Sequence, residues 1–177
     1  GDSNPPPTIQ TGGFGALASD VEWDAAFVSG HGLVLAGSSS AKAARVQLRD
    51  RSTGNIELGF DIETDIYAEA LTLDSNHIYL SGMQSNSAYV VSWKVFAYSR
   101  TDGHQVWSEA SMAATSQTPN SMAVDDTGVY TVGSFSPSGD SRWQMEKRNP
   151  LTGNLLWRQV YGEASYLTGY ATQVVLD

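Results

Sequence analysis

The chain of 177 residues is long enough for one domain with a buried core, and its 41% hydrophobic content excludes a disordered composition. Only 16% of the residues are charged and the net charge is −9, which opposes binding to nucleic acid or to an anionic membrane surface through broad charge attraction. The absence of cysteine excludes a disulfide framework, a thiolate nucleophile and cysteine-ligated metals, and no apolar run approaches the roughly 18–20 residues that cross a bilayer.

The first residues form a polar, proline-rich segment. GDSNPPPT contains three consecutive prolines and no apolar anchor, so residues 1–7 are predicted to be a disordered, extended linker. A short leader of this composition resembles the spacer behind the lipid-bearing cysteine of a bacterial lipoprotein, although that cysteine is missing from this sequence. The alternative is a solvated chain end without an anchoring role.

From residue 8 onward two local patterns recur with one period. The first is a β-prone run that ends in glycine, and the second is a short polar turn that contains glycine. The runs are LVLAGS (33–38), IYLSGM (78–83) and VYTVGS (129–134), and the turns are STGN, TDGH and LTGN around Gly54, Gly103 and Gly153. Because both patterns return after about 50 residues, they predict an internal repeat over residues 8–177.

Positions at fixed offsets from the turn glycine are apolar in every unit. Four residues after it come Leu58, Trp107 and Trp157. Eight and then ten residues before it come Val46, Val95 and Met145, followed by Ala44, Trp93 and Trp143. The stretch ARVQLRD (44–50) alternates apolar and polar residues, which indicates a half-buried strand, although AKAARVQL alone would also suit a helix.

Each unit is predicted to hold four antiparallel strands. In the third unit the strands are NSMAVDD, VYTVGSF, SRWQMEKRN and NLLWRQVYG, joined by hairpin-type turns. Four antiparallel strands in a repeat of about 45–50 residues are typical of a β-propeller blade. We therefore predict an all-β chain with blade 1 at about 23–62, blade 2 at about 67–111, blade 3 at about 119–162 and the start of a fourth at about 170–177.

A family resemblance rests on the third unit. DSRWQMEKRNPLTGNLLWRQVYG, followed by ATQVVLD, resembles the bacterial β-propeller repeats of the SBBP type and related Trp/Gly-rich families. Its Thr-Gly-x-x-x-Trp element also resembles the tryptophan-docking motif of quinoprotein-type propellers, in which the tryptophan of one blade packs on the next. The resemblance implies that Trp107 and Trp157 dock blades together at turns such as those of Gly54, Gly103 and Gly153, with Leu58 in place of a tryptophan in the first unit.

The sequence offers few groups for catalysis. Quinoprotein-type enzymes need more blades around their cofactor and a calcium site, and they often carry adjacent cysteines, so a fragment of such an enzyme is the alternative rather than the first hypothesis. His31, His77 and His104 are interpreted as exposed turn residues rather than as a shared metal site. We expect no enzyme activity, no cofactor and no metal.

One stretch of the chain is a candidate ligand face. Asp61, Glu63 and Asp65 precede the first strand of the second unit, and Tyr67, Tyr166 and Tyr170 lie in loops that lead into such strands. Carboxylates there would bind Ca²⁺ or a cationic partner, and aromatic side chains would suit a glycan or a protein. The alternatives are a solvated loop for the carboxylates and packing between blades for the tyrosines.

The expected function is a non-enzymatic binding or scaffold module of a bacterial cell-envelope β-propeller protein. Its location would be the periplasm or the cell surface, with a lipid anchor as one means of attachment, and its partner a protein or a carbohydrate. Three blades cannot close a ring, since propellers use about four to eight. We therefore expect either further blades from a longer chain or self-association of two copies into a six- or seven-bladed ring.

Overall fold

The computed structural model describes residues 22–28, 32–38, 43–50, 52–64, 66–85, 91–111, 116–136, 142–162 and 171–176. Every secondary-structure element in these ranges is a β-strand, and each paired strand is antiparallel to its neighbour. The prediction of an all-β chain is therefore confirmed. The proline-rich residues 1–7 lie outside the described residues.

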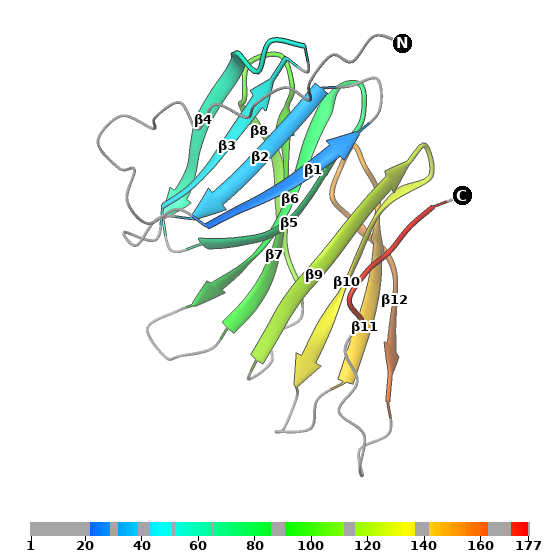
Figure 1. Cartoon of the computed structure of the whole chain (residues 1–177). Coiled ribbons are helices and arrows are strands. Elements are labelled where there is room, and N and C mark those ends of the chain that lie inside the picture. Colours follow the sequence, from blue (N-terminus) through cyan, green and yellow to red (C-terminus); the bar gives the residue numbers. More distant parts are fainter. Residues whose placement is uncertain are drawn as a thin grey trace, which may run out of the picture.

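The strands form three separate sheets of four, each following the order of the chain (Figure 1). The first sheet contains β1 (Glu22–Val28), β2 (Gly32–Ser38), β3 (Ala43–Arg49) and β4 (Ile56–Thr64). The second contains β5 (Ile66–Leu73), β6 (His77–Ser85), β7 (Val91–Ser99) and β8 (Gln105–Ala110). The third contains β9 (Ser116–Asp125), β10 (Gly128–Ser136), β11 (Arg142–Arg148) and β12 (Leu155–Tyr161).

None of the three sheets closes on itself within the described ranges, because the first and last strands of each remain at its edges. The predicted strand ARVQLRD (44–50) lies mainly in β3, and the part of AKAARVQL that the structure describes, from residue 43 on, is also strand rather than helix. Neighbouring residues of β3 face opposite sides of the sheet, but the prediction of a half-buried strand is wrong, because Gln47 and Arg49 are buried as well as Val46 and Leu48.

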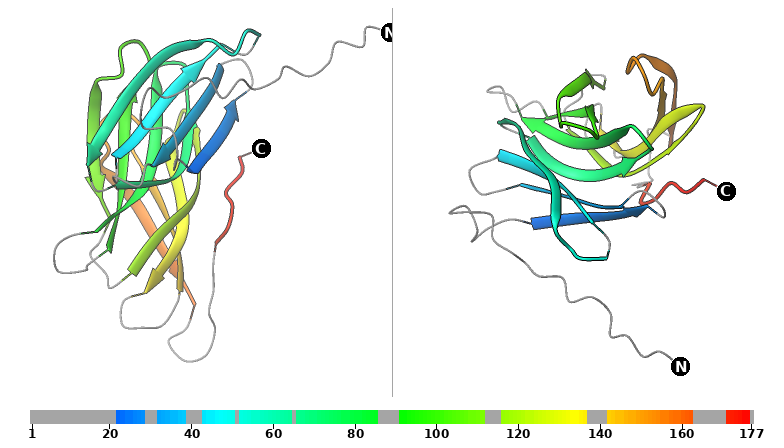
Figure 2. Two further views of the ribbon diagram at one scale, coloured as in Figure 1. Left: turned by 60° about the vertical axis from the view of Figure 1, so that its left-hand side comes forward. Right: turned by 90° about the horizontal axis from the view of Figure 1, so that it is seen from above.

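The sheets pack face to face, with the second between the first and the third (Figure 2). Each new sheet contacts the previous one through its first strand: β5 lies against β1, β2 and β3, and β9 lies against β5, β6 and β7. The second sheet is thus covered on both faces. This explains why β6 and β7 are apolar at consecutive positions rather than at alternate ones.

Two hydrophobic clusters fill the spaces between sheets. The cluster between the first and second sheets is formed by Val46, Leu48, Ile62, Ile66, Leu71, Leu73, Ile78, Leu80, Phe96 and Tyr98. The cluster between the second and third sheets is formed by Ala70, Tyr79, Trp93, Val95, Ala97, Trp107, Met122 and Val129. Each fully buried aliphatic or phenylalanine side chain contributes roughly 1.5–3 kcal/mol of transfer free energy, so these clusters are what holds the sheets together.

The turn before the last strand of each sheet has the same geometry in all three. In each, the glycine N–H donates to the carbonyl of the residue that opens the turn, at 2.9 Å, from Gly54 to Asp50, from Gly103 to Ser99 and from Gly153 to Asn149. The three glycines have φ values of 71°, 74° and 74°, in the left-handed region that favours glycine. The second repeat marker therefore corresponds to one recurring turn.

Candidate docking site and turn-edge pocket

Trp107 is the clearest contact between two sheets. It lies on β8 with 7% of its surface exposed, and its indole Nε1 donates to the backbone carbonyl of Pro150 in the third sheet at 2.9 Å. Its ring lies directly on Gly153, where an added Cβ would come within 2.6 Å of the indole. Only glycine therefore fits at this position, both because of its φ and because of the tryptophan above it.

Tyr79 supports the same contact from β6. Its ring centroid lies 6.0 Å from that of Trp107, and its hydroxyl donates to Asp74 at 2.8 Å and lies 3.4 Å from the carbonyl of Pro150. Burial, together with the hydrogen bond to Asp74, raises the pKa of the Tyr79 hydroxyl above its ordinary value. The hydroxyl is therefore protonated at neutral pH and acts as a donor.

The corresponding contact between the first and second sheets uses a different residue from the one expected. Phe60 lies on Gly103, where an added Cβ would come within 2.5 Å of the phenyl ring, and Phe60 also packs on Tyr98 at a centroid distance of 4.9 Å. Leu58, the predicted substitute for tryptophan, is half-buried against the first cluster. Successive side chains of β4 point to opposite faces of the sheet, so Phe60 lies on the same face as Leu58. Phe60, and not Leu58, covers the Gly103 turn.

Trp157 was predicted to be largely buried at a contact between blades, and for this chain the prediction of burial is wrong. It remains 37% exposed, and its ring neighbour is Tyr130 of its own sheet, at a centroid distance of 6.3 Å. The turn of the first sheet is uncovered as well, because an added Cβ at Gly54 would meet nothing within 4 Å among the described residues. Of the three turn glycines, Gly103 and Gly153 are covered by an aromatic ring and Gly54 is open.

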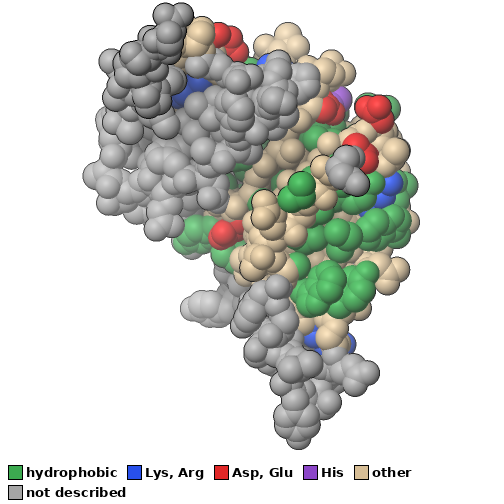
Figure 3. Space-filling model, turned by 45° about the vertical axis from the view of Figure 1, so that its right-hand side comes forward, with side chains coloured by type: hydrophobic (Ala, Val, Ile, Leu, Met, Phe, Trp, Pro, Cys, Tyr) green, Lys and Arg blue, Asp and Glu red, His purple; other side chains and the backbone are tan. Residues whose placement is uncertain are grey.

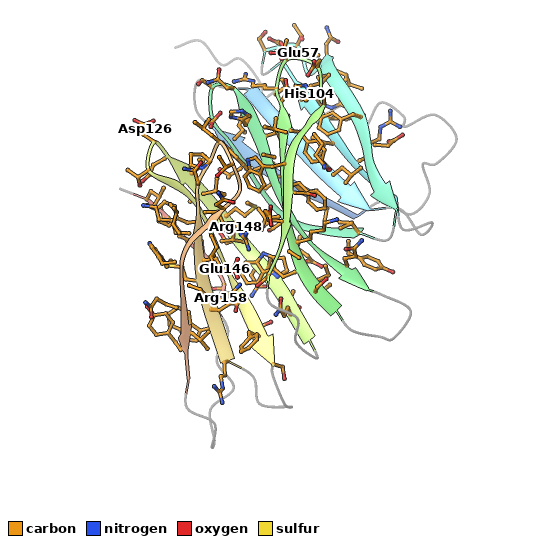
Figure 4. The ribbon with its side chains drawn as sticks, turned by 180° about the vertical axis from the view of Figure 1, so that it is seen from behind. Glu57, His104, Asp126, Glu146, Arg148 and Arg158 are labelled. Atoms are coloured by element: carbon orange, nitrogen blue, oxygen red, sulfur yellow. The ribbon has the colours of Figure 1, made fainter. Side chains whose placement is uncertain are left out.

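A buried ionic network also joins the second and third sheets. Glu146 is fully buried on β11 and accepts hydrogen bonds from Arg148 at 2.8 Å, Arg158 at 2.7 Å and the Ser111 hydroxyl at 2.6 Å (Figure 4). Arg148 also donates to the carbonyl of Ala110, so the end of β8 is fixed to β11. The sequence pattern did not indicate this network, because charged residues on a strand usually face solvent.

The first sheet contains a pair that corresponds to Arg148 and Glu146, but its acceptor is an uncharged glutamine. Arg49 donates to the side-chain oxygen of Gln47 at 2.8 Å and to the carbonyl of Gly54 at 2.8 Å, as Arg148 donates to the carbonyl of Gly153 at 3.1 Å. The signal in the sequence was an arginine five residues before the turn glycine in two of the three units.

A pocket opens at the edge of the sheets where these turns lie, an edge that also holds Glu57, His104 and Asp126 (Figure 4). Its volume is about 500 Å³, and it is lined by Leu73, Asp74, Ser75, Asn76, His77, Val124, Asp125, Asp126, Pro150 and Leu151. The pocket therefore lies between turns of the second and third sheets and presents polar and apolar atoms in similar proportion.

The carboxylates of the pocket also hold their own turns. Burial alone would raise the pKa of Asp74, but donors from the Asn76 backbone, Tyr79 and the His77 backbone lower it overall. The pKa of Asp125 responds in the same way. Burial raises it, but hydrogen bonds from the Thr127 hydroxyl and from the N–H groups of Thr127 and Gly128 lower it overall. Both side chains are therefore ionised at neutral pH.

The predicted ligand face is only partly described. Asp61 is exposed and lies 3.5 Å from the guanidinium of Arg45, and Tyr67 is 40% exposed at the start of β5. The side chain of Glu63, together with Asp65, Tyr166 and Tyr170, lies outside the described residues. Asp61 and Tyr67 alone do not define a site.

Two of the three histidines lie among the described residues, and they do not lie together. His77 is half-buried beside Asp74, His104 is exposed with Nδ1 2.6 Å from Asp102, and His31 lies outside the described residues. The described part of the chain holds no group of three or more His, Cys, Asp or Glu residues that could bind a metal ion. Nor does it hold a helix with the length and apolarity needed to span a membrane.

Comparison with known proteins adds no assignment. No protein-family model matches the chain, and no curated protein matches it.

Proposed function

We propose that this chain is a non-enzymatic binding or scaffold module built of β-propeller blades, from a protein of the bacterial cell envelope. Each four-stranded sheet is one blade, and the three blades are a partial propeller. The observation that carries the proposal is the repeated docking of an aromatic side chain on the turn glycine of the next sheet, by Phe60 on Gly103 and by Trp107 on Gly153. Such a contact fixes one rigid sheet on the next.

The chemistry of the described side chains supports a scaffold more than a catalyst. The buried charged groups on β11 are paired with one another, and Asp74 and Asp125 are used by their own turns. The turn-edge pocket is lined by the acidic residues Asp74, Asp125 and Asp126, and it suits hydroxyl or N–H donors of a carbohydrate or protein partner.

A second function has one observation in its favour. The indole of Trp107 on the Gly153 turn is the contact that the resemblance to quinoprotein-type propellers implies, so the alternative is a fragment of a larger propeller enzyme of that type. Titration of the chain with pyrroloquinoline quinone and calcium, followed by absorbance, separates the two. We expect no saturable binding, and saturable one-to-one binding would favour the enzyme.

The location is tested independently by fractionating cells that produce the protein naturally and detecting the chain with an antibody. We expect it in the periplasmic or membrane-associated fraction. Recovery in the cytosolic fraction alone would contradict an envelope scaffold.

A further inference from the structure

The third sheet repeats, on its outer face, the side chains with which the second sheet holds the third. Tyr79 and Trp107 of the second sheet have ring centroids 6.0 Å apart, and the rings at the same repeat positions of the third sheet, Tyr130 and Trp157, are 6.3 Å apart. The first pair is covered by the third sheet, whereas Trp157 is exposed. The third sheet therefore carries an aromatic pair of the docking type on which no turn among the described residues lies.

The rest of this face is also rich in aromatic and apolar residues. We call Tyr130, Trp143, Met145, Trp157 and Tyr161 the aromatic face. Trp143 stacks on Tyr161 with a centroid distance of 3.9 Å and an interplanar angle of 13°, and Tyr161 is 42% exposed. Hydrophobic side chains gather on this side of the molecule (Figure 3). An apolar surface of this kind usually marks a contact with another protein surface.

The C-terminal residues 171–176 cover the outer face of the third sheet near β9. Asn120 donates to the carbonyl of Ala171 at 2.7 Å, and the N–H of Val174 donates to the hydroxyl of Ser121 at 3.2 Å, so residues 171–176 run along β9. The part near β11 and β12, which includes Trp157, stays open.

The opposite end of the stack offers the matching feature. Gly54 has the same φ and the same turn hydrogen bond as Gly103 and Gly153, but no ring of a described residue lies on it. Arg49 donates to its carbonyl as Arg148 does to that of Gly153. The described ranges thus contain one turn of the docking type without an aromatic ring on it, and one docking tryptophan without a turn on it.

We propose that Trp157 of one copy docks on the Gly54 turn of a second copy, so that two copies associate head to tail through two identical contacts. This inference rests on the blade architecture of the proposed function. A second copy is the occupant that the geometry favours. Its Gly54 turn would cover Trp157 of the first copy, and its own Trp157 would cover the Gly54 turn of the first copy. Two copies bring together six sheets, within the range of about four to eight that closed propellers use.

The test compares variants by sedimentation equilibrium at protein concentrations from about 1 µM to about 1 mM. The salt concentration is about 0.15 M, at which repulsion between the charged copies is screened beyond about 8 Å. The unchanged chain should reach twice the mass of the 19.0 kDa monomer. Gly54→Asn should raise the dissociation constant at least about tenfold. Asparagine tolerates the left-handed φ and has open space at Gly54, but a Cβ there would enter the ring of Trp157, as one at Gly153 would enter that of Trp107.

Two further variants make the test specific. Trp157→Asp should weaken association as Gly54→Asn does. A mixture of the two variants should regain part of the association, because the first still has Gly54 and the second still has Trp157. Leu156→Asp is the matched control: Leu156 is 50% exposed on the same strand but faces the other side of the sheet, so its association should stay unchanged.

A monomeric unchanged chain at the highest concentration would overturn the proposal, as would an unaltered mass for Gly54→Asn. Neither result would overturn the blade architecture, which rests on the contact of Trp107 with the Gly153 turn. That contact is tested by the free energy of unfolding of Trp107→Ala. If Trp107→Ala instead left the free energy of unfolding unchanged, the blade architecture itself would fail.

Discussion

At the scale of single residues, the same sequence element has different consequences at its two occurrences. Trp107 and Trp157 both follow a turn glycine by four positions, yet of the three described sheets one covers Trp107 and none covers Trp157. The sequence was sufficient to predict the turns and their glycines, since a left-handed turn depends on a few adjacent residues. It was not sufficient to predict Phe60 as the residue on Gly103, because that depends on how two sheets approach each other.

Substitution of Trp107 by alanine should therefore lower the free energy of unfolding by about 3–5 kcal/mol, the usual loss for a buried tryptophan. Trp157→Ala should cost about 1 kcal/mol or less at concentrations where the chain is monomeric, since much of its surface is already exposed. His104→Ala, in an exposed turn, serves as the control and should leave stability nearly unchanged. Urea denaturation measures all three, and equal losses for the two tryptophans would contradict the distinction.

The first turn has a pH dependence of its own. Hydrogen bonds from the Ser52 hydroxyl and from the Thr53 backbone and hydroxyl lower the pKa of Asp50 from 3.8 to about 2. A depressed pKa in the folded state stabilises the protein above the unfolded-state value and loses this effect as pH falls through the folded-state value. The contribution of Asp50 should therefore disappear between pH 4 and pH 2.

Asp50→Asn isolates this contribution. The third turn already uses Asn149, whose side-chain oxygen accepts from the N–H groups of Leu151 and Thr152 at 2.9 and 3.0 Å, so asparagine can hold the turn. Denaturation midpoints of the variant and the unchanged chain should differ at pH 5 and converge near pH 2. A constant difference over this range would show that Asp50 does not titrate as described.

At the scale of elements, the strands and their order were predictable but the burial of their polar residues was not. The alternation in SRWQMEKRN shows that Gln144, Glu146 and Arg148 share one side of β11 and that Trp143 and Met145 share the other. It does not show which side another sheet covers. In the structure the side with Glu146 faces the second sheet and is buried, whereas Trp143 and Met145 on the other side are only half-buried, the reverse of what hydrophobicity alone would favour.

Glu146→Ala should be among the most destabilising substitutions on β11. Removal of the carboxylate leaves Arg148 buried and Arg158 half-buried without their partner, and the loss of one member of such a pair costs about 3–5 kcal/mol. Glu146→Gln is the matched variant, because Gln47 accepts from Arg49 in the first sheet without a charge. We expect a smaller loss for glutamine in thermal or urea denaturation, and similar losses for both would mean that the hydrogen bonds matter little.

At the scale of the whole molecule, the stack is most protected in its middle. β6 and β7 are covered on both faces, and residues such as Tyr79, Leu80, Val95 and Phe96 have no exposed surface, while most of β12 is exposed. Native-state hydrogen exchange should therefore be slowest in β6 and β7 and fastest, among the paired strands of the third sheet, in β12. Uniform exchange across the three sheets would indicate that they unfold as one unit.

The one-sided docking of ring on turn gives the stack a direction. Each sheet presents a ring to the next sheet and a turn to the previous one, so the two ends of the stack are chemically different, like the two ends of a filament subunit. Contacts between unlike ends close into a ring only when the rotation per unit divides a full circle, and otherwise they continue without limit. A substitution that changed the angle between sheets while leaving the ring-on-turn contact intact would thus convert a finite assembly into a growing fibre.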